Sequence, residues 1–197
     1  MTITQTIRNL IERAAFGELL TAKQLLEIGS RDAIDQALAR FCRAGLIVRI
    51  TRGVYTKPRA SRFGGSILPD PTSLAHAFAK LKGITLQLQG AEAVRRFGLS
   101  TQMPAQLGFQ TDGRTRILHL GKLEIRLQHA PAKMLFLAES LAGQALTALR
   151  YLGRQNINPQ QVKTILEQLP TFERQRLQEN LLNLPHWLAQ PLMVALP

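Results

Sequence analysis

Basic side chains that can bind phosphate are concentrated in one stretch of the chain. Between Asp35 and Asp70 the sequence has no acidic residue, so the basic residues there have no acidic neighbour in sequence to pair with. Each phosphate that such a residue neutralises releases counterions and adds affinity for nucleic acid. A solvated basic surface without a ligand is the plainer interpretation. The basic residues of this stretch are Arg40, Arg43, Arg49, Arg52, Lys57, Arg59 and Arg62.

Residues that could carry out catalysis or hold a metal are scattered. The four histidines show no H-E-x-x-H spacing, and Cys42 is the only cysteine, which excludes an intrachain disulfide and a cysteine-based zinc site. Walker A, G-x-G-x-x-G and G-x-S-x-G motifs are absent, and Gly64-Gly65-Ser66 is typical of a flexible connector. The sequence therefore predicts no enzyme, no catalytic residue, no metal and no cofactor.

The sequence predicts three helices before residue 45. Apolar residues at helical spacing predict a first helix over residues 3–16. The T-x-x-Q pattern of Thr21 and Gln24 predicts a capping box at the start of a short second helix. Ser30 can cap a third helix, whose apolar stripe from Ile34 to Cys42 places Cys42 in the core.

A hairpin is expected to follow the third helix. Residues 46–56 form a β-branched run interrupted by a glycine turn, which is typical of two antiparallel strands. Three helices and a hairpin predict a winged helix-turn-helix, in which the third helix enters the major groove and the hairpin tip touches the backbone. Arg40 and Arg43 would lie on the exposed helix face, and Arg49 and Arg52 on the wing. A winged helix that binds protein is the alternative.

Side-chain chemistry divides the predicted contacts into two kinds. Glutamine reads adenine and arginine reads guanine, so Arg31 and Gln36, near the front of the third helix, are the expected base contacts. Asp32 and Asp35 suit the helix dipole but repel phosphate, and two roles stay open for them: orienting the arginines or rejecting wrong bases. The expected phosphate contacts are Ser30, Arg40, Arg43, Thr51, Arg52, Lys57 and Arg59.

A second domain is expected after a stretch rich in glycine and proline. Residues 61–71 predict a junction, which gives a winged helix-turn-helix domain over residues 1–62 and an α+β domain over residues 63–197 that ends in helices. Pro131 is expected to open one long helix with an apolar stripe as far as Leu149. Further helices are expected over residues 72–82 and 91–97 and from Asn158, Thr171 and His186, with strands over residues 85–89, 108–111, 115–120 and 123–128.

Composition limits the class of protein. With 197 residues, 45% of them apolar and 19% charged, the chain is expected to fold as a globular protein. The net charge is +12, and the first ten residues contain no continuous apolar run typical of a signal peptide. No apolar run is long enough to span a bilayer. We therefore expect a cytoplasmic protein with no membrane partner.

Several motifs together resemble a known family. The chain is similar, over nearly its whole length, to the shorter branch of the AbiEi-like antitoxins of type IV, abortive-infection toxin-antitoxin systems. The matching winged-helix segments are residues 29–38, 44–47 and 52–55, and the matches downstream are residues 69–71, 98–100, Pro104, 111–113 and 148–153.

This resemblance implies a DNA-binding transcriptional regulator. Its N-terminal domain would bind inverted repeats in its own promoter, and its C-terminal domain would counter a nucleotidyltransferase toxin without the need for a stable complex. Alternatives are a one-component regulator whose C-terminal domain binds a small ligand, and an enzyme that acts on nucleic acid. The residues that the resemblance assigns to DNA binding are Ser30, Arg31, Gln36, Arg49, Arg52 and Tyr55.

Overall fold

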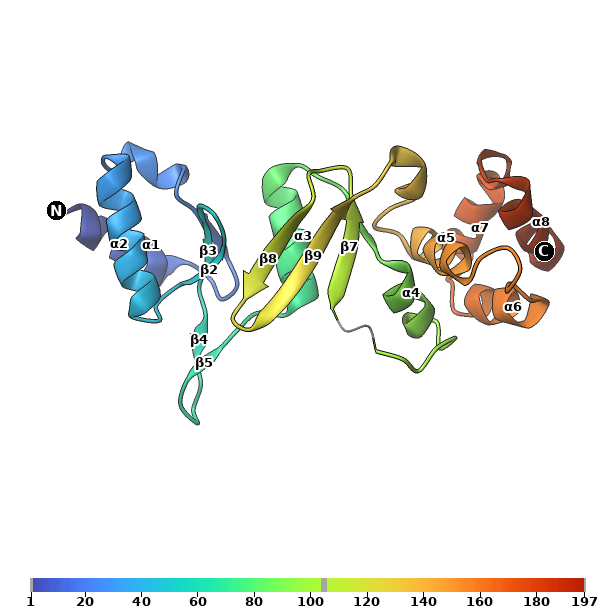
Figure 1. The fold of residues 1–197 in the computed structure, drawn as a ribbon, viewed down its shortest axis with the longest axis horizontal. Helices are drawn as coiled ribbons and strands as arrows, with labels where there is room; N and C mark the ends of the chain where they lie inside the picture. The colour runs from blue at the N-terminus through green and yellow to red at the C-terminus, as the bar shows by residue number, and fades with distance from the viewer. Residues whose placement is uncertain (1, 104–105, 197) are drawn as a thin grey trace. The chain divides into compact units, whose positions relative to one another are not determined.

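The computed structural model describes residues 2–103 and 106–196 and has the α+β architecture that the sequence predicts (Figure 1). Contacts within the chain divide it into two units. Unit 1 comprises residues 1–83 and 117–125, and unit 2 comprises residues 84–116 and 126–197. The predicted junction after residue 62 lies inside unit 1, because the helix α3 (Pro71–Lys82) belongs to that unit.

The helices of the first part of unit 1 begin at the predicted caps. Helix α1 (Ile3–Arg13) ends before the predicted residue 16, because the next residue leaves the helical conformation. Thr21 and Gln24 form the predicted reciprocal hydrogen bonds at the start of the 3-10 helix η1 (Gln24–Glu27). The Ser30 hydroxyl accepts from the backbone N–H of Ala33 and so caps α2 (Arg31–Arg43).

A three-stranded antiparallel sheet follows these helices. Strands β2 (Val48–Thr51) and β3 (Val54–Thr56) form the predicted hairpin, and a third strand, β1 (Leu19–Thr21), was not predicted. The order is β1-β3-β2. Gly53 turns the chain between β2 and β3 with a φ of 72°, a conformation that favours glycine.

The core of this part lies between the helices and the sheet. Ile34, Ala37 and Leu38 of α2 are fully buried, which confirms the predicted apolar stripe. Cys42 differs from the prediction, because it packs against the core but stays partly exposed. The buried residues of the core are Ile7, Ile11, Ala22, Leu25, Ile34, Ala37, Leu38, Phe41, Ile47 and Tyr55.

Unit 1 also contains a second, smaller hairpin. Strands β4 (Arg59–Ala60) and β5 (Ser66–Ile67) pair around the glycine-rich segment that the sequence indicates as a connector. Helix α3 follows, capped by the Asp70 carboxylate. Its Leu74 and Phe78 are fully buried.

A four-stranded sheet, with the order β6-β7-β9-β8, contains the strands predicted after residue 84. They are β6 (Leu86–Leu88), β7 (Leu107–Thr111), β8 (Arg116–Leu120) and β9 (Leu123–His129). Beside β6 in sequence, α4 (Gly90–Arg96) packs against α5 (Leu141–Leu152). The buried Gln87 donates to the Thr147 hydroxyl of α5 at 2.8 Å.

The predicted long helix from Pro131 is wrong up to Ser140, whereas its later part, with the apolar stripe as far as Leu149, forms α5. The chain instead forms a short 3-10 helix, η2 (Ala132–Met134), and then turns before α5 begins. Leu137 and Glu139 have positive φ angles of 57° and 65°, which a helix does not permit. Gly143 allows the turn to pass close to α5, because a Cβ there would lie only 2.0 Å from the Leu137 carbonyl oxygen.

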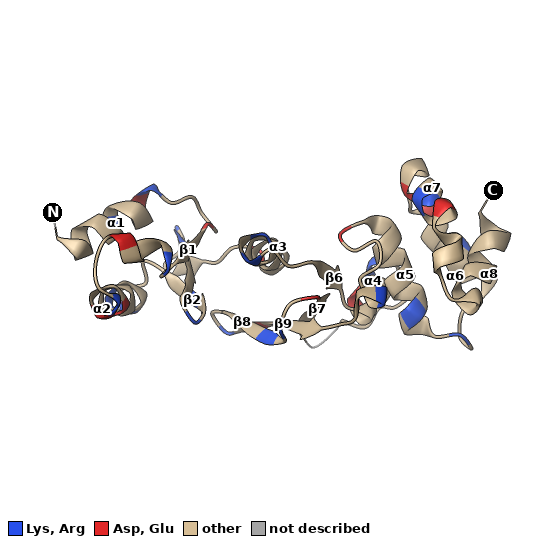
Figure 2. Cartoon of the chain, turned by 90° about the horizontal axis from the view of Figure 1, so that it is seen from above, with Lys and Arg blue, Asp and Glu red and all other residues tan. Residues whose placement is uncertain are grey.

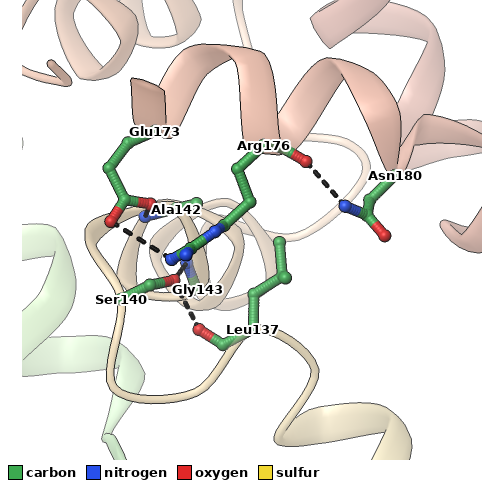
Figure 3. Close-up of polar contacts among 7 residues, drawn as sticks. All are labelled: Leu137, Ser140, Ala142, Gly143, Glu173, Arg176 and Asn180. Atoms are coloured by element: carbon green, nitrogen blue, oxygen red, sulfur yellow. Dashed lines mark hydrogen bonds and ion pairs between the residues drawn. The ribbon is translucent and has the colours of Figure 1, made fainter. Parts of the chain in front are cut away.

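The N-terminus of α5 is capped by two side chains (Figure 3). The Ser140 hydroxyl accepts from the Gly143 N–H at 3.0 Å, and the buried Glu173 carboxylate accepts from the Ala142 N–H at 3.1 Å. Glu173 also pairs with Arg176 at 3.4 Å. The hydrogen bond to Ala142 links α7 (Thr171–Glu179) to α5, whereas the pair with Arg176 lies within α7.

Helices complete unit 2, as the sequence predicts. They are α6 (Pro159–Glu167), α7, the 3-10 helix η3 (Leu181–Asn183) and α8 (His186–Ala195). Asn158 and Gln161 form a capping box at the start of α6. Over residues 2–103 and 106–196, no helix has both the length and the apolar character needed to cross a membrane.

Candidate nucleic-acid interface

A basic pocket of about 420 Å³ lies between α2 and the hairpin of β2 and β3. Four of its residues are arginines that the sequence predicts to contact DNA, and one is an acidic residue. We call it the arginine pocket. It is lined by Arg31, Asp35, Ala39, Cys42, Arg43, Arg49, Arg52, Gly53 and Tyr55.

Helical spacing explains how α2 contributes to the arginine pocket. Arg31, Asp35, Ala39 and Arg43 follow one another at intervals of four residues, so they share one face of the helix. The buried residues of the helix, such as Ile34 and Leu38, lie on the adjoining face that packs into the core. The folding of the helix onto its apolar stripe therefore presents two arginines to the hairpin.

The hairpin contributes the other two arginines. Arg49 lies in β2 opposite Tyr55 of β3, and Arg52 lies in the turn. The register shifts between Arg49 and Thr51, a local irregularity in the strand that carries Arg49. Both arginine side chains are exposed.

Only one carboxylate offsets the positive charge of the arginine pocket. The Arg31 Nε donates to Asp35 Oδ2 at 2.8 Å, and this hydrogen bond raises the pKa of Arg31. Both side chains are about half exposed, at 49% and 47%, so the pair adds little stability. In the part of the chain that the structure describes, Arg49 and Arg52 have no ion pair. The pocket therefore keeps a net positive charge.

Tyr55 and Cys42 form the apolar wall of the arginine pocket. Tyr55, which the resemblance assigns to DNA binding, is only 6% exposed and belongs to the hydrophobic core while also lining the pocket. Burial raises the pKa of both the Tyr55 phenol and the Cys42 thiol, and the Arg49 charge partly opposes this. Both groups are therefore neutral at neutral pH.

A second face of α2 carries Gln36 and Arg40, which are exposed and do not line the pocket. Figure 2 shows basic and acidic residues together on this helix. The Arg40 Nε lies 3.4 Å from the Gln36 carbonyl oxygen, which places its side chain along the helix. Ser30 is occupied in capping, and Thr51 is partly buried.

Three other predicted phosphate contacts are not gathered into the arginine pocket. The Lys57 Nζ donates to the carbonyl oxygens of Glu12 and Ala14, at 2.7 and 2.9 Å, and so binds the end of α1. Arg59 lies over the Phe16 ring at 5.2 Å. Arg62 is exposed in the tip between β4 and β5. Partners distant in sequence thus occupy Lys57 and Arg59.

Sequence reasoning did not place Cys42 or Ala39 at the site. The spacing of four residues from Arg31 could have found Ala39, because it marks the helix face that carries Arg31. The ion pair of Asp35 agrees with one of its two predicted roles, the orientation of an arginine. Within residues 2–103 and 106–196, no group of three or more His, Cys, Asp or Glu residues could hold a metal ion.

Comparison with known protein families identifies the family of this chain. Residues 6–177 match DUF6088, a family of unknown function. The chain belongs to DUF6088. No curated protein matches this DUF6088 chain.

A solved structure similar to the DUF6088 chain is that of the RV2827C protein from Mycobacterium tuberculosis. The two share 14% sequence identity over 96% of this chain and 80% of that one, with a TM-score of 0.46. A likeness of this size carries no argument about function.

Proposed function

We propose that this DUF6088 chain is a DNA-binding antitoxin that represses its own promoter. Unit 1 acts as a winged helix in this proposal, with α2 in the major groove and the hairpin of β2 and β3 against the backbone. The single observation that carries the DNA-binding part is the arginine pocket, where four arginines from two elements face one carboxylate.

The two faces of α2 suit two kinds of DNA contact. The arginine pocket, between helix and hairpin, suits a backbone phosphate, because guanidinium groups bind phosphate oxygens with two parallel hydrogen bonds. Gln36, which is exposed outside the arginine pocket, is placed to reach a base edge and to read adenine. Arg31 lines the arginine pocket but is paired with Asp35, so we place it on the phosphate side, where it contacts phosphate only when that pair opens.

The antitoxin part rests on the resemblance to the AbiEi-like family. The expected targets are inverted repeats upstream of the gene and a nucleotidyltransferase toxin encoded beside it. Co-expression of that toxin with the full chain tests the second target, with growth as the readout. If the chain does not restore growth, the protein would be a repressor without antitoxic function.

DNA binding is tested by fluorescence anisotropy on the full chain across a salt series. We expect the upstream DNA to stay bound at a salt concentration that releases a scrambled duplex. The double variant R49Q/R52Q should reduce the slope of log affinity against log salt by about 1.8, which is about 0.9 for each lost phosphate contact. The variant K163Q removes an exposed charge from α6 and serves as the control.

An unchanged slope for R49Q/R52Q would remove the arginine pocket from the interface. Equal binding to both duplexes at all salt concentrations would leave a phosphate-binding surface without sequence recognition.

A one-component regulator that binds a small ligand is the second candidate. The observation that favours it is a cavity in unit 2 beside Arg150. This function differs from the first in requiring a ligand to change DNA affinity.

A further inference from the structure

A buried guanidinium nitrogen in unit 2 has no partner. Arg150 lies in the last turn of α5, and its Nη1 atom is buried without a hydrogen bond to any residue that the structure describes. Burial lowers the pKa of Arg150, and no carboxylate opposes this effect. No carboxylate among the described residues compensates this guanidinium, so an anion that meets its accessible part in the neighbouring cavity would be held strongly.

Arg150 borders a cavity of about 610 Å³, a size typical of small-molecule sites. A second cation, Lys133, also lines this cavity, and Asn183 adds a polar amide. None of the described residues that line it is acidic. The cavity, which we call the Arg150 pocket, is lined by Lys133, Met134, Phe136, Arg150, Asn183, Leu184, Pro185 and Trp187.

The rest of the lining is apolar and includes two aromatic side chains, Phe136 and Trp187. An inorganic ion would use only the charged part of this lining. An organic anion would use both parts, because its charged group can meet a guanidinium while an apolar body packs against the rings.

We propose that the Arg150 pocket binds a small organic anion. The carboxylate or phosphate of the ligand pairs with Arg150 and Lys133, and its apolar or aromatic body lies against Phe136 and Trp187. The pocket is built entirely from unit 2. The proposal is therefore independent of DNA binding by unit 1, and either can fail alone.

Trp187 gives a direct readout because it is the only tryptophan in the chain. The full protein, labelled with ¹⁵N, has one indole N–H signal, which can be followed during titration with four compounds that carry the same ring. Benzoate and phenyl phosphate are the anionic probes, benzyl alcohol is neutral and benzamidine is cationic. We expect saturable shifts of the indole signal with one or both anions and at least tenfold weaker effects with the other two.

Variants locate the charge that is responsible. R150Q should weaken anion binding at least tenfold, R150K should retain part of it, and K163Q should leave it unchanged. Far-UV circular dichroism checks that R150Q is folded. A fold defect in R150Q would shift the test to K133Q, which should also weaken binding.

Two results would overturn the proposal. One is an indole signal that responds to benzyl alcohol or benzamidine as strongly as to the anions, or to none of the four compounds. The other is unchanged anion binding in folded R150Q. A response to phenyl phosphate alone would identify the charged group as a phosphate, and a response to benzoate alone would identify it as a carboxylate.

Discussion

In unit 2 Arg95 and Arg96 of α4 and Arg176 of α7 pair with buried carboxylates, whereas the arginine pocket of unit 1 leaves most of its arginines without one. Glu92 is 7% exposed and accepts hydrogen bonds from both Arg95 and Arg96, and Glu173 is 5% exposed and pairs with Arg176. In the arginine pocket only Arg31 meets a carboxylate, and that pair is half exposed.

This comparison shows that a count of arginines does not locate a binding surface. A guanidinium held by a buried carboxylate already has its partner and mainly stabilises the fold. A guanidinium on a concave surface without a carboxylate can still receive a phosphate. The position of acidic residues, more than that of basic ones, separates the two regions.

The largest expected effect tests whether the carboxylates of unit 2 are structural. Glu173→Ala removes the cap of the Ala142 N–H and the partner of Arg176, so the free energy of unfolding should fall by about 2 to 3 kcal/mol. Urea unfolding measures this, with the exposed Glu179→Ala as control. If folded Glu173→Ala lost DNA affinity, the conclusion that this carboxylate is only structural would be wrong.

The next effect tests base reading by the exposed face of α2. Gln36→Ala should weaken binding to the upstream DNA by about 1 to 3 kcal/mol, because the amide that reads adenine is lost. Binding to a scrambled duplex should change little. Anisotropy on the two duplexes measures the difference, and Arg43→Ala is the contrast, since loss of a phosphate contact weakens both duplexes alike. Equal losses for Gln36→Ala on both duplexes would remove the base-reading role.

A smaller effect of opposite sign sharpens the comparison. Asp35→Asn removes the one carboxylate of the arginine pocket and releases Arg31. DNA affinity should rise, by about tenfold if one phosphate contact is gained, and the salt slope should steepen by about 0.9. Stability should be nearly unchanged, because the pair is exposed. A fall in affinity would mean that Asp35 positions Arg31 for its contact.

The smallest effect concerns pH. Hydrogen bonds from Arg95 lower the pKa of Glu92 below its usual 4.5, so the ionised carboxylate stabilises the fold above that pH. The contribution is lost as pH falls through the lower folded value. Glu92→Gln should cost about 1 kcal/mol at neutral pH and progressively less below pH 4.5. Urea unfolding at pH 3 to 7 measures this, with exposed Glu167→Gln as control.

Local signals in the sequence predicted the first part of the fold well. The caps at Thr21 and Ser30 and the apolar stripe of α2 depend on residues within four positions of each other, so periodicity and capping chemistry are sufficient to predict them. The strand β1 was missed because three residues give no alternation to recognise. The interruption before α5 was missed because Leu137 and Glu139 are not residues that signal a positive φ.

The candidate site was predictable in composition but not in detail. The four arginines of the arginine pocket were all among the predicted contacts, since helical spacing and the hairpin turn fix their places. The roles of Lys57 and Arg59 depend on Glu12, Ala14 and Phe16, which lie more than forty residues away. No pattern in a single sequence indicates such distant pairs.

The chain carries its own reporter of access to the arginine pocket. Cys42, the only cysteine, lies in the pocket wall, and burial raises the thiol pKa and so lowers the fraction of thiolate. An alkylating reagent should therefore label it slowly, and faster as the solution becomes more alkaline. A ligand bound between α2 and the hairpin would shield the sulfur. The alkylation rate therefore measures the occupancy of the arginine pocket over time with no engineered label.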